Sequence, residues 1–375
     1  MKNKIFFFGF MTIWIVLIIL NFLIPPVGFS EQENRTLAKF PTFTWEKLIE
    51  GTYQEELDNY INDHFIFRNG WVKLKSGLEQ LLGKTDNNEV YIGKDGYLFE
   101  KFEYTQKEKQ NLQIAANTIN QFVNKIEIPV SFALIPNSIE INKEKLPDFV
   151  EVPNQKQIIQ QMNDLLEEKI NKVQLIDLLE ESSKNKELQL YFKTDHHMTS
   201  LGSFLVYQKI SKSMGIQTKD LKEYTRIELS KEFLGTFDSK AQIIGQEADK
   251  LDVYLNEGNL LLEEVVYDNE TTKSIFNEAY LKKKDKYSFF LNGNNSKVVV
   301  KTKNHNGKKL LVIKDSYAHN MVPYFCQDFE EIHFIDPRYY RLPLSTYIEE
   351  NNLTEVLFLY NVSNIIQDVG IRNVR

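Results

Sequence analysis

Residues 308–320 read KKLLVIKDSYAHN, an apolar run that ends in an aspartate and a serine. A short, continuous run of apolar and β-branched residues is typical of a strand that is buried on both faces of a sheet. The following residues, YAHNMVPYF (317–325), have the pattern of a helix. Ser316 is therefore predicted at the carboxyl end of a strand, which is where open α/β sheets bind their ligands.

The same alternation of strand and helix recurs along the chain. Further strands are predicted in IPVSFALIP (128–136), EEIHFID (330–336), TEVLFLYNVS (354–363) and the beginning of VQLIDLLEES (173–182). Helices are predicted over 105–126, 155–172, 200–214 and 345–352. This alternation predicts an α/β fold in which helices flank a parallel sheet. From about 218 to 305 the pattern changes to short strands, which indicates a β-rich insertion.

The segment YFKTDHHMTSLGS (191–203) places an aspartate and two histidines side by side. A serine is a weak nucleophile until a base, itself oriented by a third group, removes its proton. Asp195 can accept the Nδ1–H of His197 and leave Nε2 free for Ser316. We therefore predict that these three residues meet in the fold, although 119 positions separate His197 from Ser316. His196 is expected to be structural or to line the cleft.

Other interpretations of these residues remain open. Ser316 is also suited to be the N-cap of the helix that follows it. The Asp-His-His triplet could supply metal ligands, but the remaining histidines lack ligand-type spacing, and we predict no metal. A third possibility is a non-catalytic glycan-binding or assembly protein with a degenerate site.

Two more predicted strands end in polar residues that are candidates for substrate binding. Arg338, in IDPRYY (335–340), follows one strand and could face a carboxylate with its planar fork of donors. Tyr360 and Asn361 end the last apolar strand, at the same expected edge of the sheet, where they could contact a substrate or an oxyanion.

The first part of the chain predicts a membrane anchor. Residues 5–24 carry no charge, and a helix of twenty residues is about 30 Å long, the thickness of a hydrocarbon core. Lys2 and Lys4 precede this run and Glu31 follows it, so residues 1–30 are predicted to form a cytoplasmic stub and a single-pass signal-anchor. Residues 31–375 would then form an extracytoplasmic domain. A cleavable signal peptide is the alternative.

Composition excludes several classes of function. The net charge of −7 argues against a nucleic-acid partner, which requires a basic face. The single cysteine, Cys326, excludes an intramolecular disulfide, a four-cysteine zinc site and an iron–sulfur cluster held by four cysteines. We therefore expect no cofactor.

Several motifs together resemble those of the DHHW protein family of Firmicutes, which is similar to the SGNH-hydrolase-like alginate O-acetyltransferases AlgJ and AlgX. The shared motifs are ENRTLAKFP (33–41), DHFIFR (63–68), GKDGYLFE (93–100), TDHHMTSLG (194–202), FLGTFDSKA (233–241), KDSYAHN (314–320) and IDPRYY (335–340). Met198 stands where the family has a tryptophan, and Lys314 stands where a GDSL motif has its glycine.

This resemblance implies an SGNH-hydrolase-like sheet and a Ser-His-Asp triad of Ser316, His197 and Asp195 that transfers acyl groups. The implied activity is O-acetylation of a cell-surface or secreted polysaccharide at a Gram-positive cell membrane. A membrane-bound O-acyltransferase is the expected acetyl supplier, because cytosolic acetyl donors are absent outside the membrane. Carbohydrate O-acetylesterase activity on the same fold is the alternative.

Overall fold

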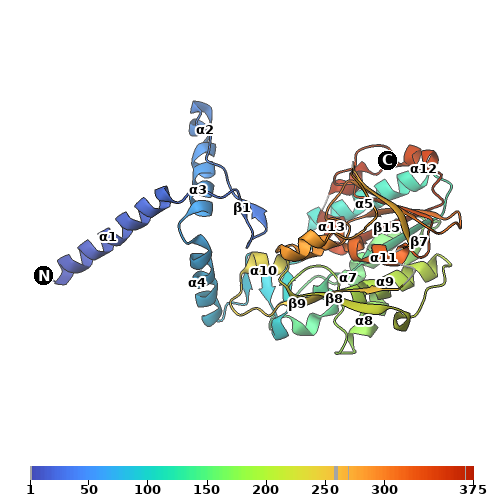
Figure 1. The fold of residues 1–375 in the computed structure, drawn as a ribbon, viewed down its shortest axis with the longest axis horizontal. Coiled ribbons are helices and arrows are strands. Elements are labelled where there is room, and N and C mark those ends of the chain that lie inside the picture. The colour runs from blue at the N-terminus through green and yellow to red at the C-terminus, as the bar shows by residue number, and fades with distance from the viewer. Residues whose placement is uncertain (1, 257–260, 269, 368) are drawn as a thin grey trace. The chain divides into compact units, whose positions relative to one another are not determined.

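The computed structural model describes residues 2–256, 261–268, 270–367 and 369–375 (Figure 1). The chain divides into two compact units. The larger unit comprises residues 88–238 and 247–375, and the smaller unit comprises residues 1–87 and 239–246. The residues predicted to carry chemistry all belong to the larger unit.

An eight-stranded sheet forms the centre of the larger unit, in the order β11-β10-β12-β14-β13-β15-β6-β7 (Figure 1). The five strands that run parallel are β14 (Glu331–Ile335), β13 (Lys309–Lys314), β15 (Glu355–Asn361), β6 (Val130–Ile135) and β7 (Asn171–Val173). The antiparallel edge is formed by β12 (Lys297–Thr302), β10 (Leu262–Tyr267) and β11 (Glu270–Thr272). The predicted α/β class is confirmed, but the sheet is mixed rather than wholly parallel.

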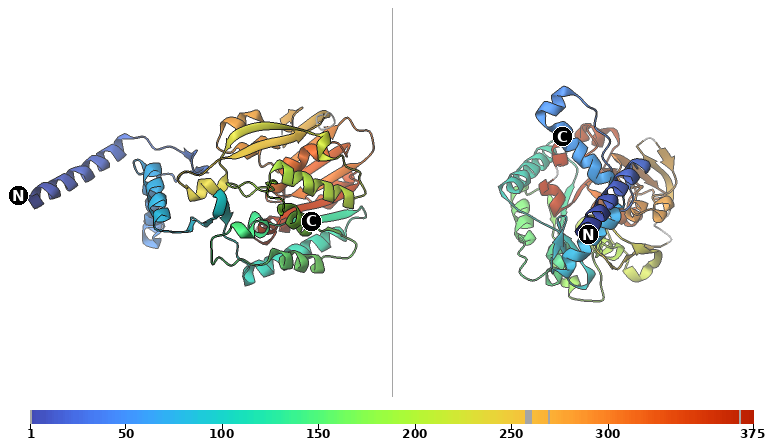
Figure 2. Two further views of the ribbon diagram at one scale, coloured as in Figure 1. Left: turned by 90° about the horizontal axis from the view of Figure 1, so that it is seen from below. Right: turned by 90° about the vertical axis from the view of Figure 1, so that its left-hand side faces the viewer.

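Helices cover both faces of this sheet (Figure 2), which explains the apolar runs in the sequence. Every residue of β6 is buried, as is every residue of β13 and β15 after the first. One group of packed helices consists of α5 (Gln106–Val123), α7 (Gln155–Leu165) and α13 (Val362–Gln367). A second group consists of α9 (Ser200–Ser213), α11 (Val322–Phe325) and the 3₁₀ helix η6 (Ser316–Met321).

Shorter elements complete the larger unit. They are the hairpin of β4 (Val90–Ile92) and β5 (Leu98–Glu100), the helices α6 (Ser138–Ile141), α8 (Ile176–Ser183) and α12 (Leu344–Glu350), and the 3₁₀ helices η1 (Lys94–Gly96), η2 (Lys143–Lys145), η3 (Leu221–Glu223), η4 (Glu278–Lys282), η5 (Lys286–Phe289) and η7 (Val369–Asn373).

The segment from 218 to 305 is rich in strands, but it does not form one separate section. Strands β8 (Thr225–Phe233) and β9 (Asp249–Leu255) pair only with each other among the described strands. Strand β12 instead pairs with β14, so β10, β11 and β12 extend the main sheet. Strand periodicity does not reveal which edge a strand will join, which is why the sequence suggested an independent insertion.

Three predicted elements differ in extent or type. The helix predicted over 155–172 ends at Leu165, because Leu166 is extended and the chain then enters β7. The strand predicted to begin at 173 is only the last residue of β7, and the helix α8 follows. The helix after Ser316 begins as a 3₁₀ turn, and Pro323 then opens the short α11.

The carboxyl ends of the central strands meet at one edge of the sheet. Lys314 at the end of β13 lies opposite Leu359 of β15, and Asn361 lies opposite Ile135 of β6. Ser316 follows β13 directly, so the candidate nucleophile lies at the edge predicted from the strand pattern.

The smaller unit contains the apolar N-terminal helix α1 (Lys2–Leu23). Its other elements are the paired strands β1 (Phe29–Ser30) and β2 (Arg35–Thr36), the helices α2 (Trp45–Glu50), α3 (Thr52–His64) and α4 (Arg68–Leu81), and the strand β3 (Asp86–Asn87). The short helix α10 (Thr236–Ala241) begins in the larger unit and ends in this one. Residues 4–21 of α1 are long and apolar enough to cross a membrane, which fits either an anchor or a signal sequence.

Charged residues of two motifs brace the smaller unit. Arg35 of ENRTLAKFP pairs with Glu33 at 2.6 Å and with Asp63 of DHFIFR at 2.5 Å. Arg68 also pairs with Glu33, and Asp63 accepts the Ala38 N–H at 2.8 Å. These motifs therefore tie the segment after β1 to helices α3 and α4.

Candidate active site

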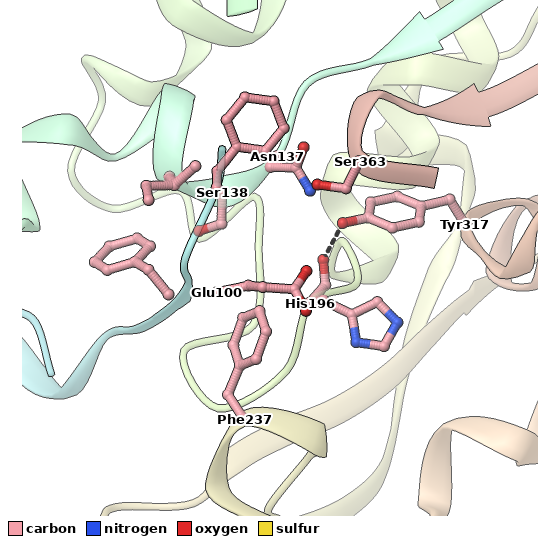
Figure 3. A pocket seen from close by; sticks show the side chains of 10 residues that line it. Glu100, Asn137, Ser138, His196, Phe237, Tyr317 and Ser363 are labelled. Atoms are coloured by element: carbon pink, nitrogen blue, oxygen red, sulfur yellow. Dashed lines mark hydrogen bonds between the residues drawn. The ribbon is translucent and has the colours of Figure 1, made fainter. Parts of the chain in front are cut away.

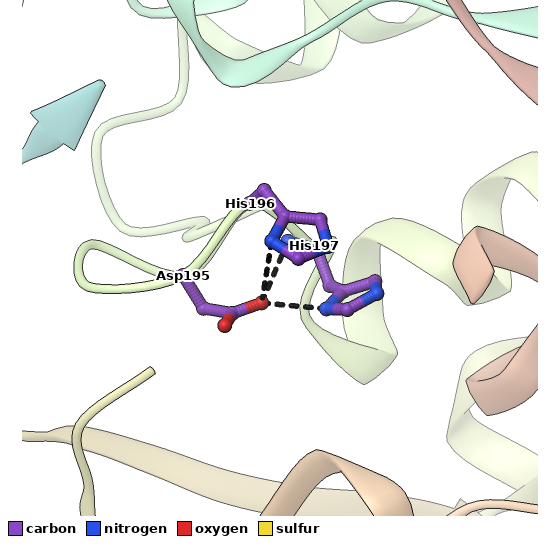
Figure 4. Close-up of side chains that lie close together, drawn as sticks. All are labelled: Asp195, His196 and His197. Carbon is purple, nitrogen blue, oxygen red and sulfur yellow. Dashed lines mark hydrogen bonds and ion pairs between the residues drawn. The ribbon is translucent and has the colours of Figure 1, made fainter. Parts of the chain in front are cut away.

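The three residues predicted to meet form a continuous chain of hydrogen bonds in the larger unit. Nδ1 of His197 lies 2.5 Å from Oδ1 of Asp195 (Figure 4). Nε2 of the same ring lies 2.8 Å from Oγ of Ser316. Asp195 and His197 are buried, whereas Ser316 is partly exposed. A substrate can therefore reach the serine while water is kept from the carboxylate.

Asp249 of β9 holds the loop that precedes Asp195. Its two carboxylate oxygens accept the backbone N–H groups of Lys193 at 2.9 Å and Thr194 at 2.8 Å. The Thr194 hydroxyl donates to the same carboxylate at 2.7 Å. Thr199, at the other end of the loop, caps α9 by accepting the Gly202 N–H. The Asp-His-His loop is thus fixed at both ends by side-chain contacts.

The FLGTFDSKA motif supports Asp195 from the other side. The Thr236 N–H donates to Oδ2 of Asp195 at 2.7 Å, and the Gly235 N–H donates to the Thr194 hydroxyl at 3.1 Å. A Cβ atom on Gly235 would lie 2.3 Å from both Cβ and Oδ2 of Asp195. Only glycine allows this approach, which gives a physical reason for the glycine in the motif.

The surroundings keep the carboxylate charged and the imidazole neutral. Burial alone would raise the pKa of Asp195, but His196, His197 and the Thr236 N–H hold it below its ordinary value. Burial lowers the pKa of His197 to about 4, and His196 lowers it as well, while Asp195 opposes the shift. A neutral imidazole with its Nδ1–H directed at a carboxylate presents a free lone pair on Nε2 to a hydroxyl group.

Tyr287, in η5, is a contact that the sequence analysis missed. Its ring is stacked on the imidazole of His197 with a centroid distance of 3.6 Å and an angle of 10°. Its hydroxyl donates to the backbone oxygen of Ser316 at 3.2 Å. The centroid of the His196 ring also lies 3.8 Å from that of the His197 imidazole, at an angle of 38°. No sequence signal marks Tyr287, because it lies in the segment interpreted as an insertion and its role depends only on tertiary packing.

Asp315 secures the backbone beside the nucleophile. Its carboxylate accepts the Tyr317 N–H at 2.9 Å, the Asn361 N–H at 2.7 Å and the Asn364 amide at 2.8 Å. Asp315, not Ser316, is therefore the N-cap of the turn, and the alternative that Ser316 caps the helix is wrong. The Tyr317 N–H is occupied, whereas the Ser316 N–H has no hydrogen-bond acceptor among the described residues.

Lys314, which replaces a glycine of the GDSL motif, is buried beneath the nucleophile. Its Nζ lies 2.7 Å from Nε2 of His319 and 3.7 Å from Asp336. Burial lowers the pKa of Lys314 to about 8, and burial also holds the pKa of His319 well below its ordinary value. His319 is therefore a neutral acceptor for the lysine, and Asp336 compensates the buried charge.

The candidate substrate-binding residues lie in different environments. Arg338 is pinned to Asp336 by hydrogen bonds of 2.9 and 2.6 Å, and a quarter of its side chain is exposed. Tyr360 is buried in the core. Asn361 is buried as well, and its amide binds the Ile135 oxygen, the Asn137 amide and the Ser363 N–H. A substrate contact by Asn361 would require it to give up these bonds.

His196 lines a small cavity beside the hydrogen-bonded chain (Figure 3). Its backbone oxygen accepts the Tyr317 hydroxyl, and the cavity has room for about one water molecule. Asn137, which lines the same cavity, has an Oδ1 atom without a hydrogen-bond partner among the described residues.

The Asp-His-His triplet also presents atoms that could ligate a metal. One ligand atom from each residue lies within 4.8 Å of the others. However, both oxygens of Asp195 already accept hydrogen bonds, and the two imidazoles face each other at an angle of 38°. Imidazole lone pairs lie in the ring plane, so the rings would have to reorient to share an ion. The geometry fits a carboxylate–imidazole pair better than a metal centre.

The model of the DHHW protein family matches residues 86–335. A DHHW family protein from Eubacterium siraeum has 24% identity and a TM-score of 0.66, covering 77% of this chain and 96% of that one. Bacillus cereus PatB1 with a sulfonyl adduct has 23% identity and a TM-score of 0.65, covering 76% and 98%. These two likenesses show a shared fold.

A weaker structural match is the O-acetyltransferase domain of Pseudomonas putida AlgJ. It has 14% identity and a TM-score of 0.46, and it covers 74% of this chain and 92% of that domain. No curated protein matches the sequence.

The protonation state of His197 is the first testable consequence. We expect the imidazole to be neutral at pH 7 and to take up a proton only near pH 4, because it is buried beside a second histidine. A pH titration of ¹⁵N-labelled histidines, with His197→Gln to assign the signal, measures this directly. A midpoint at or above the ordinary value of 6.5 would contradict the description of the site.

A second consequence concerns the close approach of Gly235 to Asp195. Gly235→Ala should destabilise the fold by about 1–3 kcal/mol, because the added methyl group overpacks the carboxylate. Denaturant unfolding measures the effect, and the His197 signal should shift as well. Gly70→Ala is the matched control, because nothing lies within 4 Å of a Cβ at that helical glycine. Equal stability of the two variants would refute the steric argument.

Proposed function

The chain belongs to the DHHW protein family, and we propose that it is an O-acetyltransferase in which Ser316 is the nucleophile, His197 the general base and Asp195 the residue that orients the base. The observation that carries this proposal is the 2.8 Å contact between Nε2 of His197 and Oγ of Ser316, with Asp195 on the opposite nitrogen. A neutral base oriented by a buried carboxylate is what a serine needs to attack a carbonyl.

The proposed reaction has two stages. His197 accepts the Ser316 proton through Nε2 while Oγ attacks the acetyl carbonyl of the donor, which gives a tetrahedral oxyanion. The oxyanion collapses, the imidazolium returns the proton to the departing donor oxygen, and the acetyl group remains on Ser316. An acceptor hydroxyl then attacks this ester while His197 accepts its proton, and the imidazolium returns that proton to Oγ as Ser316 is released.

The Ser316 N–H is the proposed donor to the oxyanion. It has no acceptor among the described residues, whereas Asp315 occupies the Tyr317 N–H. Asp315 thus fixes the turn so that one backbone donor is available beside the reacting oxygen. A six-residue 3₁₀ turn stands where the sequence predicted a longer helix. The proposed stabilisation of the oxyanion therefore comes from this single N–H and not from a helix dipole.

Family resemblance supports the acetyl group and the glycan acceptor. The DHHW family is similar to the alginate O-acetyltransferases, and PatB1, which shares this fold, carries a sulfonyl adduct. A sulfonyl adduct forms when a nucleophile attacks the reagent, which is consistent with a reactive centre on this fold. Arg338 and His196 are the proposed contacts to the acceptor polysaccharide, since both are partly exposed near Ser316.

The proposed location is the outer face of the cell membrane, with α1 as an uncleaved anchor. Cytosolic acetyl donors cannot reach a site outside the membrane, so a membrane-bound O-acyltransferase is the proposed supplier of acetyl groups. An acetylesterase on this fold would use the same acyl-serine and resolve it with water. Transfer and hydrolysis therefore differ in the acceptor, a sugar hydroxyl or water, and not in the nucleophile.

Transfer and hydrolysis can be separated in one assay. We expect acetyl groups from a chromogenic ester to appear on short acceptor oligosaccharides, and an acetylated Ser316 peptide to be seen by mass spectrometry. Ser316→Ala should abolish both, and Asp195→Asn should lower the rate roughly 10⁴-fold because it favours the wrong imidazole tautomer.

The matched control for Ser316→Ala is Ser213→Ala, because Ser213 lies beside Asn171 at the amino end of β7. Product in the acceptor with wild type and with this control supports transfer. Acetate as the sole product in the presence of acceptors would favour the esterase, and full activity of Asp195→Asn would overturn the assignment of the catalytic residues.

Tyr287 is the proposed positioning residue for His197. Tyr287→Leu should reduce kcat about five- to thirtyfold with little change in KM, because a stacked ring stabilises the imidazolium by about 1–2 kcal/mol. Tyr287→Phe keeps the ring and should restore most of the rate. Steady-state kinetics and an unfolding curve for each variant make the check, and equal rates for Leu and Phe would refute the role of the ring.

A further inference from the structure

Helix α4 exposes its large apolar residues to solvent. Trp71, Leu74, Leu78 and Leu81 recur at intervals of three and four, so they form one stripe along the helix, the α4 stripe. Their exposed fractions are 48%, 51%, 52% and 85%. Leu82, directly after the helix, is 87% exposed. This run of apolar surface is continuous from one end of the helix to the other.

The face of α4 that packs within its own unit consists of small residues. Ser76 is 2% exposed and donates to the backbone oxygen of Ala241 at 3.3 Å. A Cβ on Gly77 would lie 2.5 Å from the side chain of Ile244, so that side chain covers the glycine. A surface helix normally buries its large apolar face and exposes its small polar one. In α4 the arrangement is reversed: the small residues are packed and the large apolar residues are exposed. The α4 stripe is therefore free to bind another apolar surface.

The segment directly before α4 is hydrogen-bonded to the end of the apolar helix α1. Oδ1 of Asn21 accepts the Ile66 N–H at 2.9 Å, and Asn21 is the last residue of the candidate membrane span. Trp71, on the first turns of α4, donates its indole N–H to the backbone oxygen of Ile66 at 3.1 Å. If α1 crosses a bilayer, α4 therefore starts at the level where the chain leaves the hydrocarbon.

The charges on α4 suit an anionic surface. Lys73, Lys75 and Lys84 lie on or directly after the helix, and Glu79, the one acidic residue of the helix, pairs with Lys75 at 3.9 Å and with Lys84 at 3.3 Å. Arg68, at the start of the helix, is already paired with Glu33, so the three lysines supply the net positive charge. A basic amphipathic helix with a tryptophan on its apolar face is the pattern of helices that lie in the headgroup region of a membrane. Anionic headgroups attract such basic residues at about 1 kcal/mol for each Lys or Arg near the surface.

We propose that the α4 stripe inserts into the outer leaflet of the membrane at the boundary between headgroups and acyl chains, where its basic residues bind anionic phospholipid. The inference rests on the part of the proposed function that places α1 across the membrane. Helix α4 would then lie in the plane of the interface and restrict the motion of the smaller unit about the end of α1. A second copy of the chain and a membrane-protein partner are the competing occupants of the stripe.

The test uses the full-length chain in vesicles, with a nitroxide label on Leu78→Cys. The matched control is a label on Asn69→Cys, because Asn69 is an exposed residue of α4 on the side opposite Leu78. Native Cys326 is buried, and treating the wild-type chain with the nitroxide reagent checks that Cys326 takes up no label. Collision rates with oxygen and with a water-soluble relaxant report the depth of each label. The vesicles contain either phosphatidylglycerol with phosphatidylcholine or phosphatidylcholine alone.

We expect the label at 78 to collide mainly with oxygen, and the label at 69 mainly with the aqueous relaxant, in the vesicles that contain phosphatidylglycerol. Omitting phosphatidylglycerol should reduce this contrast. The proposal is overturned if both positions are equally accessible to the aqueous relaxant, or if the contrast is the same in both lipids. It is also overturned if labels at 78 show dipolar broadening that disappears on dilution with unlabelled protein. That last outcome would identify a second copy of the chain as the occupant.

Alkaline extraction of the same vesicles separates this inference from the anchor it depends on. Retention of the protein shows that α1 is inserted, and an exposed label at 78 then overturns the role of α4 alone. Release of the protein refutes the anchor instead. Leu74→Glu in the retained chain should leave extraction unchanged but reduce the contrast between the two labels.

Discussion

The candidate site depends on the contact between a buried carboxylate and the imidazole two residues after it. Asp195 has to remain ionised without water, and it does so because two imidazoles and a backbone N–H surround it. The approach of Gly235 and the clamp from Asp249 hold that environment in place. The residues that do the proposed chemistry are thus few. Several neighbouring residues serve to shield the Asp195 carboxylate from water and to hold it against the His197 imidazole.

Local pattern was sufficient for the elements with the strongest signals. The apolar runs of β6, β13 and β15 predicted strands buried on both faces, and the helix predicted over 200–214 is α9. The contact between His197 and Ser316 was predicted on chemical grounds, because a serine nucleophile requires a base. Sequence could not place β12 beside β14 or Tyr287 on His197, because neither contact leaves a trace in spacing or composition.

Buried charge is concentrated beneath the nucleophile. Lys314, His319, Asp336 and Arg338 form one group, in which a neutral imidazole and a carboxylate accept from two cations. Such groups cost desolvation energy and are retained only where their geometry is well satisfied. Here they join the ends of β13 and β14, while Asp315 joins β13 to β15. Polar contacts rather than apolar packing therefore determine the shape of this edge of the sheet.

The bond from the Asn361 N–H to Asp315 has a consequence for biogenesis. Synthesis proceeds from the N-terminus, so Asp195 and Ser316 are made before Asn361 and Asn364, which secure the turn at Asp315. The last strand of the sheet to be synthesised, β15, supplies that bond and inserts between β13 and β6. The turn that carries Ser316 is therefore secured only after β15 has been made, so the proposed centre is not assembled on a chain that lacks this strand.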